Sequence, residues 1–257
     1  MITDHDVVQY FKQPPRRIPL KLIDYRKGEK YARQISRGIL SNKWENAHRY
    51  GCGRHLDVFA KHKVIPKYCF GCIKVVIYPR NVVELFKLLM IFEMIMLPAD
   101  NTRKCMVEVR DYIAGTYKGF VYSRSIEEAN EIYKIIRLSI SENISPDVAV
   151  AIKRGCSEYE TVYPEFSKVG ETEFMSYNDN WQGYEDAVDN EIASKYGDID
   201  LRSINKARTL YSPNEIMAMQ FWLRYAATIG DSSYIKIFGT TIRPVPDLVR
   251  PPFNNTI

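Results

Sequence analysis

The chain has 257 residues, of which 46% are hydrophobic and 26% are charged, and its formal net charge is +5. This length allows one large or two small domains, and the hydrophobic content excludes a chain that is disordered throughout. The sequence begins without a basic leader and an apolar stretch, and its longest apolar run, 85–97, contains Lys87 and Glu93. We therefore expect a cytoplasmic protein with no secretory signal and no contact with a membrane.

The charge is unevenly distributed along the chain. Residues 1–72 contain 15 Lys and Arg against 6 Asp and Glu, whereas the remaining residues contain 21 against 25. The basic excess predicts a face that binds a polyanion such as nucleic acid. The alternative, which the sequence leaves open, is that this basic surface docks on the acidic C-terminal half of the same chain. The residues expected to contact phosphates are Arg16, Arg17, Arg33 and Arg37.

The first segment, residues 1–68, is expected to form a basic N-terminal arm. Within it, apolar residues at helical spacing predict an amphipathic helix from about residue 29 to residue 47. The arm also contributes the first half of a predicted metal site, which begins at Cys52.

Metal-binding side chains gather at the end of this arm. The sequence reads Cys52-Gly53-Arg54-His55, then thirteen residues, then Cys69-Phe70-Gly71-Cys72. Two pairs of ligands separated by a short loop are typical of tetrahedral zinc, because each pair spans two vertices. The Cys69–Cys72 pair also fits a redox function, but it leads into a strand and not into a helix, which favours metal. His48 and His62 are expected at the surface or behind the ligands.

The middle segment, residues 69–156, gives a regular alternation of strands and helices. Strands are predicted at residues 72–78, 104–110, 118–123 and 148–153, and helices at residues 81–97 and from Ser125 to about Ser145. The order β-α-β-β-α-β predicts an α+β fold of the ferredoxin-like type. We expect a four-stranded antiparallel sheet with both helices on one face.

This arrangement adds a distant cysteine to the metal site. In a ferredoxin-like sheet the first and last strands are expected to be antiparallel neighbours at the centre, so the end of the last strand lies beside the start of the first. Cys156 follows the last strand, which makes a four-thiolate set of Cys52, Cys69, Cys72 and Cys156, with His55 as the rival fourth ligand. Zinc is the expected metal, and an iron–sulfur cluster is the alternative. Cys105 belongs to an alternating strand and is expected in the core.

One stretch of this segment is similar to a known family. Residues 118–129, KGFVYSRSIEEA, resemble the third strand and second helix of RNA-recognition motifs, and the resemblance extends to about residue 137. It implies that Phe120 and Tyr122 share a sheet face and stack on bases, joined by Lys74 of the first strand. The glycine-aromatic run is one residue shorter than in the family. The alternative is that the C-terminal region covers this face.

The last segment, residues 157–257, is predicted to wrap around the sheet domain. Residues 157–200 are acidic and show no firm period, so we expect them to form a wrapping connection. Residues 213 to about 229 predict a helix that is capped by Ser212 and ended by Gly230. Because the helix at residues 81–97 is apolar around most of its circumference, we expect the C-terminal helix to cover its outer side.

Together these features predict a zinc-binding protein with a structural cysteine-rich site that binds nucleic acid or has a regulatory role, with RNA favoured over DNA. A closed four-ligand site favours a structural metal, since catalytic zinc keeps one position for water. No phosphate-binding glycine loop or nucleophile elbow occurs, so an enzyme is not favoured. Two alternatives remain: an iron–sulfur or zinc metalloenzyme or redox protein, and an adaptor that binds a protein partner or a second copy of itself.

Overall fold

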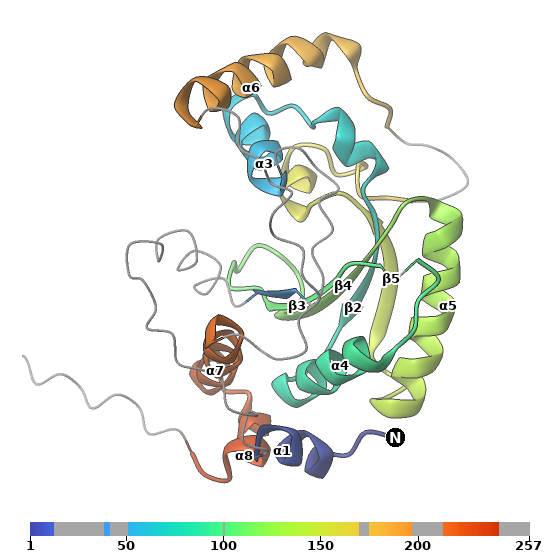
Figure 1. Cartoon of the computed structure of the whole chain (residues 1–257), viewed down its shortest axis with the longest axis vertical. Coiled ribbons are helices and arrows are strands. Elements are labelled where there is room, and N and C mark those ends of the chain that lie inside the picture. Colours follow the sequence, from blue (N-terminus) through green and yellow to red (C-terminus); the bar gives the residue numbers. More distant parts are fainter. Residues whose placement is uncertain (13–38, 42–50, 100, 170–174, 197–212, 242–257) are drawn as a thin grey trace, which may run out of the picture.

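A computed structural model describes residues 1–12, 39–41, 51–99, 101–169, 175–196 and 213–241. The fold is α+β, with a five-stranded antiparallel sheet and helices packed around it (Figure 1). The strands are β1 (Ile39–Ser41), β2 (Ile73–Tyr78), β3 (Arg103–Val107), β4 (Tyr117–Ser123) and β5 (Ala149–Arg154). The helices are α1 (Asp4–Lys12), α3 (Gly51–His62), α4 (Val82–Met94), α5 (Ile126–Asn143), α6 (Gln182–Tyr196), α7 (Pro213–Thr228) and α8 (Ile235–Phe238). Short 3-10 turns are η2 (Lys67–Gly71), η3 (Ser157–Thr161), η4 (Asp179–Trp181) and η6 (Ser232–Tyr234).

The strand order in the sheet is β1-β3-β4-β2-β5. Strand β2 pairs with β5 in a register that places Ile73 opposite Arg154, so the predicted pairing of the first and last strands is confirmed. Their expected position is partly wrong, because β2 is interior whereas β5 forms an edge. Four strands come from residues 69–156, as predicted, and β1 adds a fifth.

Strand β1 corrects the prediction for the N-terminal arm. Ile39–Ser41 pair antiparallel with β3, with Ile39 opposite Met106, where the sequence predicts part of a helix. An edge strand offers unpaired N–H and C=O groups, and a short extended segment satisfies them. This partner is distant in sequence, so the local helical spacing does not reveal it. The remainder of the helix predicted over residues 29–47 lies outside the described residues.

Helices α4 and α5 begin within one residue of their predicted starts, directly after Asn81 and Ser125. The Asn81 side chain accepts a hydrogen bond from Glu84 N at 3.0 Å, and Ser125 Oγ accepts one from Glu128 N at 3.2 Å. Both helices pack on one face of the sheet (Figure 1). Their inward side chains join alternate residues of the strands in the main core, which includes Val75, Leu85, Phe92, Val121, Ile132 and Ile136. The predicted layer of two helices on one sheet face is confirmed.

The outer side of α4 is covered by the N- and C-terminal helices. Trp222 of α7 is fully buried, and its ring centroid lies 5.5 Å from that of Phe86. This confirms the predicted role of the C-terminal helix, which ends at Thr228. Helix α1, which the sequence analysis did not identify, contacts α4 and α8. Asp4 of α1 forms ion pairs with Lys87 at 2.6 Å and with Lys236 at 2.7 Å.

Helix α6 lies in the segment that the sequence predicts as a wrapping connection, and the sequence analysis did not identify it. In Figure 1, α6 lies beside α3, beyond the end of the sheet at which β2 begins. Val188 of α6 packs against Val58 and Val64. Because α6 buries only a narrow apolar strip and is otherwise held by charged side chains, its sequence lacks a strong helical period. Within the described residues, no helix has the length and apolar character needed to cross a membrane.

Candidate metal centre

Four of the five cysteines come from segments that meet at one end of the sheet. Cys52 is in the first turn of α3, Cys69 is in η2, Cys72 directly precedes β2, and Cys156 directly precedes η3. Gly155 N donates a hydrogen bond to Cys72 O at 2.8 Å, which continues the β2–β5 ladder beyond Ile73 and Arg154. The antiparallel pairing therefore brings Cys156 beside Cys72, as the sequence predicts.

A 3-10 turn sets the spacing of Cys69 and Cys72. Cys69 N donates to Pro66 O at 2.9 Å, and Cys72 N donates to Cys69 O at 3.3 Å. Residues three apart lie above one another in a 3-10 helix, so the two cysteines are on the same side of the turn. Cys69 is buried, and its Sγ lies 3.1 Å from the hydroxyl of Tyr159 in η3.

One side of helix α3 faces these turns. Cys52, His55 and Phe59 share that side, since they are spaced by three and four residues. The Phe59 ring contacts Tyr159 edge to face, with centroids 4.9 Å apart. His55 is buried and stacks on Tyr68 of η2 at 5.4 Å. Cys52 is exposed at the start of this row. The helix is thus held against both η2 and η3.

The thiols influence one another electrostatically. Burial raises the pKa of Cys72 to about 11, and Cys156 and Cys52 add to this effect while Lys74 and Lys104 oppose it. Burial also raises the pKa of Cys69, with further contributions from Cys156, Cys72 and Cys52. Although Cys52 is exposed as a residue, the protein around its thiol removes part of the solvent, and this effect together with Cys156 raises its pKa. Thiols that crowd in this way stay protonated at neutral pH unless a cation lies among them, and a bound metal ion reverses the balance.

The side chains lie near one another without converging on a point. Among the residues that the structure describes, no three His, Cys, Asp or Glu side chains are placed to hold a metal ion in this conformation. The Cys69 sulfur, for example, is directed to the Tyr159 hydroxyl. Rotation about χ1 moves a cysteine sulfur between staggered positions without moving the backbone. Thiols are the ligands that a thiophilic metal prefers, but in this conformation the four side chains do not form a coordination site.

The remaining metal-capable residues are outside this group. Cys105 is fully buried in the main core beneath the helices, which confirms its predicted structural role. The His62 ring lies 5.0 Å from that of Tyr184 in α6. His48 lies outside the described residues. We call Cys52, Cys69, Cys72 and Cys156 the cysteine cluster.

The sheet face opposite the helices carries the residues that the RNA-recognition resemblance singles out. Phe120 is 9% exposed and Lys74 5% exposed, whereas Tyr122 is half-buried. Turn η3 lies over part of this face, since its Glu158 and Glu160 form ion pairs with Arg110 and Lys153. Part of the segment after residue 156 therefore covers the face, in line with the alternative expectation. The predicted phosphate contacts Arg16, Arg17, Arg33 and Arg37 lie outside the described residues.

Three basic residues of α3 and η2 are paired within the chain. Arg54 Nε and Nη2 donate to Asp189 at 2.7 and 2.8 Å, and Arg54 Nη1 donates to Glu185. Lys61 forms an ion pair with Glu191, and Lys67 lies 3.9 Å from Asp179. For these residues of α3 and η2, the structure therefore agrees with the alternative expectation, in which the basic half docks on the acidic C-terminal half of the same chain.

Glu185 is the centre of that contact. Besides Arg54, it accepts hydrogen bonds from Lys67 N at 2.8 Å and from the Tyr177 hydroxyl at 2.9 Å. Its side chain is 5% exposed and that of Arg54 is 7% exposed. This buried network fixes the rotation of α3 about its axis, and hence the direction in which Cys52 and His55 point.

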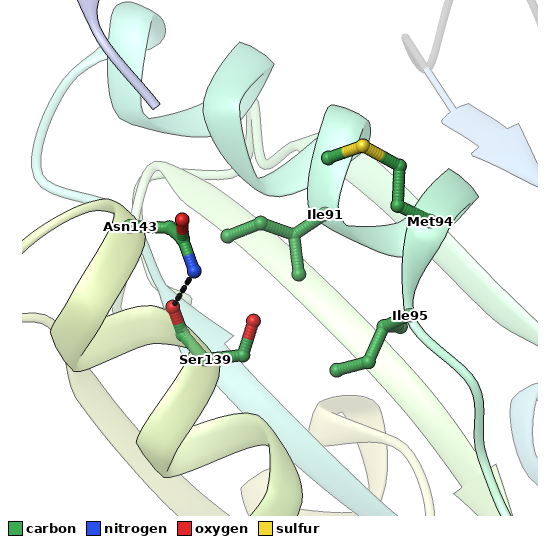
Figure 2. A pocket seen from close by; sticks show the side chains of 5 residues that line it. All are labelled: Ile91, Met94, Ile95, Ser139 and Asn143. Carbon is green, nitrogen blue, oxygen red and sulfur yellow. Dashed lines mark hydrogen bonds between the residues drawn. The ribbon is translucent and has the colours of Figure 1, made fainter. Parts of the chain in front are cut away.

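A shallow groove between α4 and α5 offers no comparable chemistry. It has a volume of about 230 Å³ and is lined by Ile91, Met94, Ile95, Ser139 and Asn143 (Figure 2). None of these residues is charged, Met94 is the one soft donor among them, and the Asn143 amide already donates to Ser139 O at 2.9 Å. The cysteine cluster is therefore the stronger candidate for a functional site.

Comparison with known proteins gives no relative: no family model matches the chain, and no curated protein or solved structure gives a significant match.

Sequence reasoning missed Tyr68 and Tyr159 as neighbours of the thiols. Tyr159 lies three residues after Cys156, which is one 3-10 turn, so this spacing is a signal that could have pointed to it. It also missed Lys104 and Glu185, whose partners are distant in sequence.

Proposed function

We propose that the chain is a zinc-binding protein in which a structural four-ligand site supports a nucleic-acid-binding function, with RNA favoured over DNA. The observation that supports the metal site is that α3, the turn before β2 and the turn after β5 lie together, so that four of the five cysteines are at one end of the sheet. We further infer that residues 69–156 form a ferredoxin-like domain. The order β3-β4-β2-β5 and the two helices on one face support this inference.

The surroundings favour a structural metal over a catalytic one. Cys69 and Cys156 pack in a cluster with the rings of Phe59, Tyr159 and Phe166. A site filled by four protein ligands and walled by aromatic rings leaves no position for a reacting water. Zinc, when bound, would supply a cross-link between α3, η2 and η3. Since the unfolded chain has no preformed site, the free energy of binding would add to the free energy of folding.

The nucleic-acid function rests on the basic excess in the first part of the sequence. Residues 1–50 contain 11 Lys and Arg against 5 Asp and Glu. The basic residues of α3 and η2, by contrast, are paired with α6 and η4. We therefore assign the phosphate contacts to residues 1–50, including Arg16, Arg17, Arg33 and Arg37. Tyr122 is the more accessible ring for base stacking, since Phe120 and Lys74 are buried.

Metal analysis tests the site directly. Protein purified without chelator should contain about one zinc per chain and be colourless, whereas an iron–sulfur cluster would give a brown protein with visible absorption. Cys69→Ser and Cys72→Ser should give unstable or insoluble protein, because each removes a ligand from a site coupled to folding. A chain purified in this way that holds no stoichiometric metal rules out the proposal.

A second candidate function is a protein-interaction adaptor. It is favoured by the ion pairs between α3 and α6, which show that basic residues of this chain already accept an acidic helix. An adaptor would keep the structural metal but would not retain RNA or DNA at low salt. The binding measurement described in the Discussion separates the two.

A further inference from the structure

Two lysines converge on one pair of aromatic rings, on the sheet face opposite the helices. Lys74 of β2 lies opposite Tyr122 of β4, and Lys104 of β3 lies opposite Phe120 of β4. The Lys74 ammonium is 5.1 Å from the Phe120 ring centroid and 5.9 Å from that of Tyr122. The corresponding distances for Lys104 are 4.9 and 5.7 Å. Since the two distances to the Phe120 centroid are 5.1 and 4.9 Å, the two ammonium nitrogens are at most their sum, 10.0 Å, apart.

These two lysines differ from their neighbours in their partners. Lys118 of the same face forms an ion pair with Glu108 at 3.6 Å. Lys153, which lies directly opposite Lys74 on β5, forms one with Glu160. For the two converging lysines, the described residues provide no carboxylate within ion-pair distance. The fold therefore neutralises the neighbouring lysines and leaves two ammonium charges close together.

Contacts with the rings do not balance these two charges. Lys74 is only 5% exposed, so its ammonium has little contact with water. A cation that is removed from water needs an opposite charge or several hydrogen bonds, and the face of a ring replaces only part of the lost hydration. Both cations also share the same two rings, and like charges repel each other. An anion bound between the two ammonium groups would relieve the burial and the repulsion together.

The convergence point has a buried side and an accessible side. Lys74 and Phe120 are buried, whereas Lys104 and Tyr122 are half-buried and keep contact with solvent. An anion would therefore enter from the side of Lys104 and Tyr122 and would meet the Lys74 ammonium at the inner end. The two rings would lie beside it, which suits a ligand that carries an organic group next to its charge.

We propose that Lys74 and Lys104 form a binding site for a phosphate monoester. A monoester carries about −1.5 to −2 charges at neutral pH and has three strong acceptor oxygens, whereas each diester phosphate of a nucleic-acid strand carries about one. Two ammonium groups match the monoester, and each donates to an oxygen of its own. Lysine suits this role because its flexible stem brings a compact charge to the phosphate.

This site does not depend on the metal centre, and it goes beyond general contacts with RNA, because the internal phosphates of a strand are diesters. Two sources supply a phosphate monoester. One is the terminal phosphate of a nucleic-acid strand, and the other is a small phosphorylated molecule such as a mononucleotide. Both present the same group to the two lysines.

Calorimetry with the full-length chain at low salt tests the site, with adenosine 5′-monophosphate as the probe. The monophosphate should bind, and inorganic phosphate should compete with it. Adenosine, which lacks the phosphate, should bind at least about tenfold more weakly, because it cannot form the charge-assisted hydrogen bonds. The cyclic 3′,5′-monophosphate, a diester of the same nucleoside, should also bind more weakly than the monoester.

Single variants show whether the two lysines hold the phosphate. Lys74→Gln and Lys104→Gln should each weaken binding of the monophosphate by about tenfold or more, because each removes a charge-assisted hydrogen bond. Lys74→Arg should keep most of the affinity. Lys118→Gln is the matched control, since it removes a buried lysine of the same face whose partner is Glu108. It should leave the affinity nearly unchanged.

Thermal unfolding separates weaker binding from loss of the fold. Without ligand, Lys74→Gln should be at least as stable as the wild-type chain, because it removes a buried charge that has no carboxylate partner among the described residues. The monophosphate should raise the melting temperature of the wild-type chain, since a ligand that binds the folded state stabilises it. It should not raise that of the variant in which both Lys74 and Lys104 are changed to Gln.

Two RNA strands of one sequence, with and without a 5′-terminal phosphate, distinguish the two sources. Tighter binding of the phosphorylated strand that is lost in Lys104→Gln assigns the site to strand ends. Equal binding of the two strands, with the mononucleotide still bound, assigns it to a small phosphorylated molecule.

Three results would overturn the inference. The first is that the wild-type chain binds neither the monophosphate nor inorganic phosphate, and the second is that adenosine binds as well as its monophosphate. The third is that Lys118→Gln weakens binding as much as Lys74→Gln and Lys104→Gln, which would make the effect a general one of the basic face. If RNA still binds in any of these cases, the proposed nucleic-acid function stands without this site. If the monophosphate binds through the two lysines and no RNA is retained, the site stands and the nucleic-acid function fails.

Discussion

Individual side chains show why the site region depends on long-range contacts. Arg54 is two residues from Cys52, yet its partners Glu185 and Asp189 are more than 130 positions away. The guanidinium is planar and forms two parallel bonds to Asp189, a geometry that lysine cannot reproduce. The residue next to the cluster therefore sets the position of α3 through a segment that sequence analysis treats as a connection.

The first prediction concerns this arginine. Arg54→Ala leaves Glu185 buried without its charged partner, so it should lower the free energy of unfolding by about 3 kcal/mol or more. Lys61→Ala is the control, because its pair with Glu191 is exposed and should contribute less than about 1 kcal/mol. Urea denaturation of both variants gives the comparison. Equal, small effects would show that the Arg54 network does not hold α3.

At the level of elements, Asp231 joins the C-terminal region to the sheet domain. Its Oδ2 accepts hydrogen bonds from Val82 N at 2.7 Å and from the Tyr117 hydroxyl at 2.6 Å. Ser233 N donates to Oδ1 at 3.0 Å, so the carboxylate also starts the turn after α7. One side chain thus links the first turn of α4, strand β4 and the connection to α8.

The second prediction follows from the titration of Tyr117. Burial and the hydrogen bond to Asp231 raise the pKa of Tyr117 above its ordinary value near 10. A phenol whose pKa is raised in the folded state contributes stability that is fully present below its pKa in the unfolded chain, near 10. This contribution is lost as the pH rises from that value toward the pKa in the folded state. Tyr117→Phe should therefore flatten the fall in stability between about pH 10 and pH 11.5. Thermal denaturation across this range measures it.

Tyr112→Phe is the control for that measurement, since Tyr112 is 66% exposed. It should leave the alkaline profile unchanged. If Tyr117→Phe and wild-type protein lose stability in parallel above pH 10, the contact with Asp231 does not govern the titration.

The elements also show what the sequence could predict. Strands β2 to β5 and helices α4, α5 and α7 follow from local signals, such as the cap at Ser125, and their predicted boundaries agree to within three residues. The meeting of Cys72 and Cys156 follows from strand order alone. Strand β1 and helix α6 could not be predicted, because one is stabilised by pairing with β3 and the other by Arg54 and Lys61 of α3. The positions of Tyr159 and Lys104 depend on the same long-range packing.

At the scale of the whole molecule, the positive charge of residues 1–72 falls in two places. Arg54, Lys61 and Lys67 are paired with the acidic segment that contains η4 and α6. The remaining excess lies in residues 1–50, where 11 Lys and Arg face 5 Asp and Glu. If the protein binds nucleic acid, the affinity should come from residues 1–50, because the basic residues of α3 and η2 are already paired.

The third prediction tests this division by the salt dependence of RNA binding. Each neutralised phosphate releases counterions, so the logarithm of the affinity should fall linearly with the logarithm of salt concentration, by about 0.7 per contact for a single strand. Changing Arg16, Arg17, Arg33 and Arg37 to Gln should weaken binding to all sequences alike and flatten this slope. Filter binding or fluorescence anisotropy at several salt concentrations gives both quantities.

Its controls come from the same chain. Lys61→Gln and Lys67→Gln remove the same charge from positions that Glu191 and Asp179 already neutralise, so they should leave the slope unchanged. Tyr122→Ala and Phe120→Ala should each cost about 1–3 kcal/mol of binding only where the ring stacks on a base. If the paired lysines matter as much as the four arginines, the bound polyanion must displace α6 from α3. If no RNA or DNA is retained even at low salt, nucleic acid is not the partner, and the acidic helix already present on α3 points to an adaptor that recognises acidic protein segments.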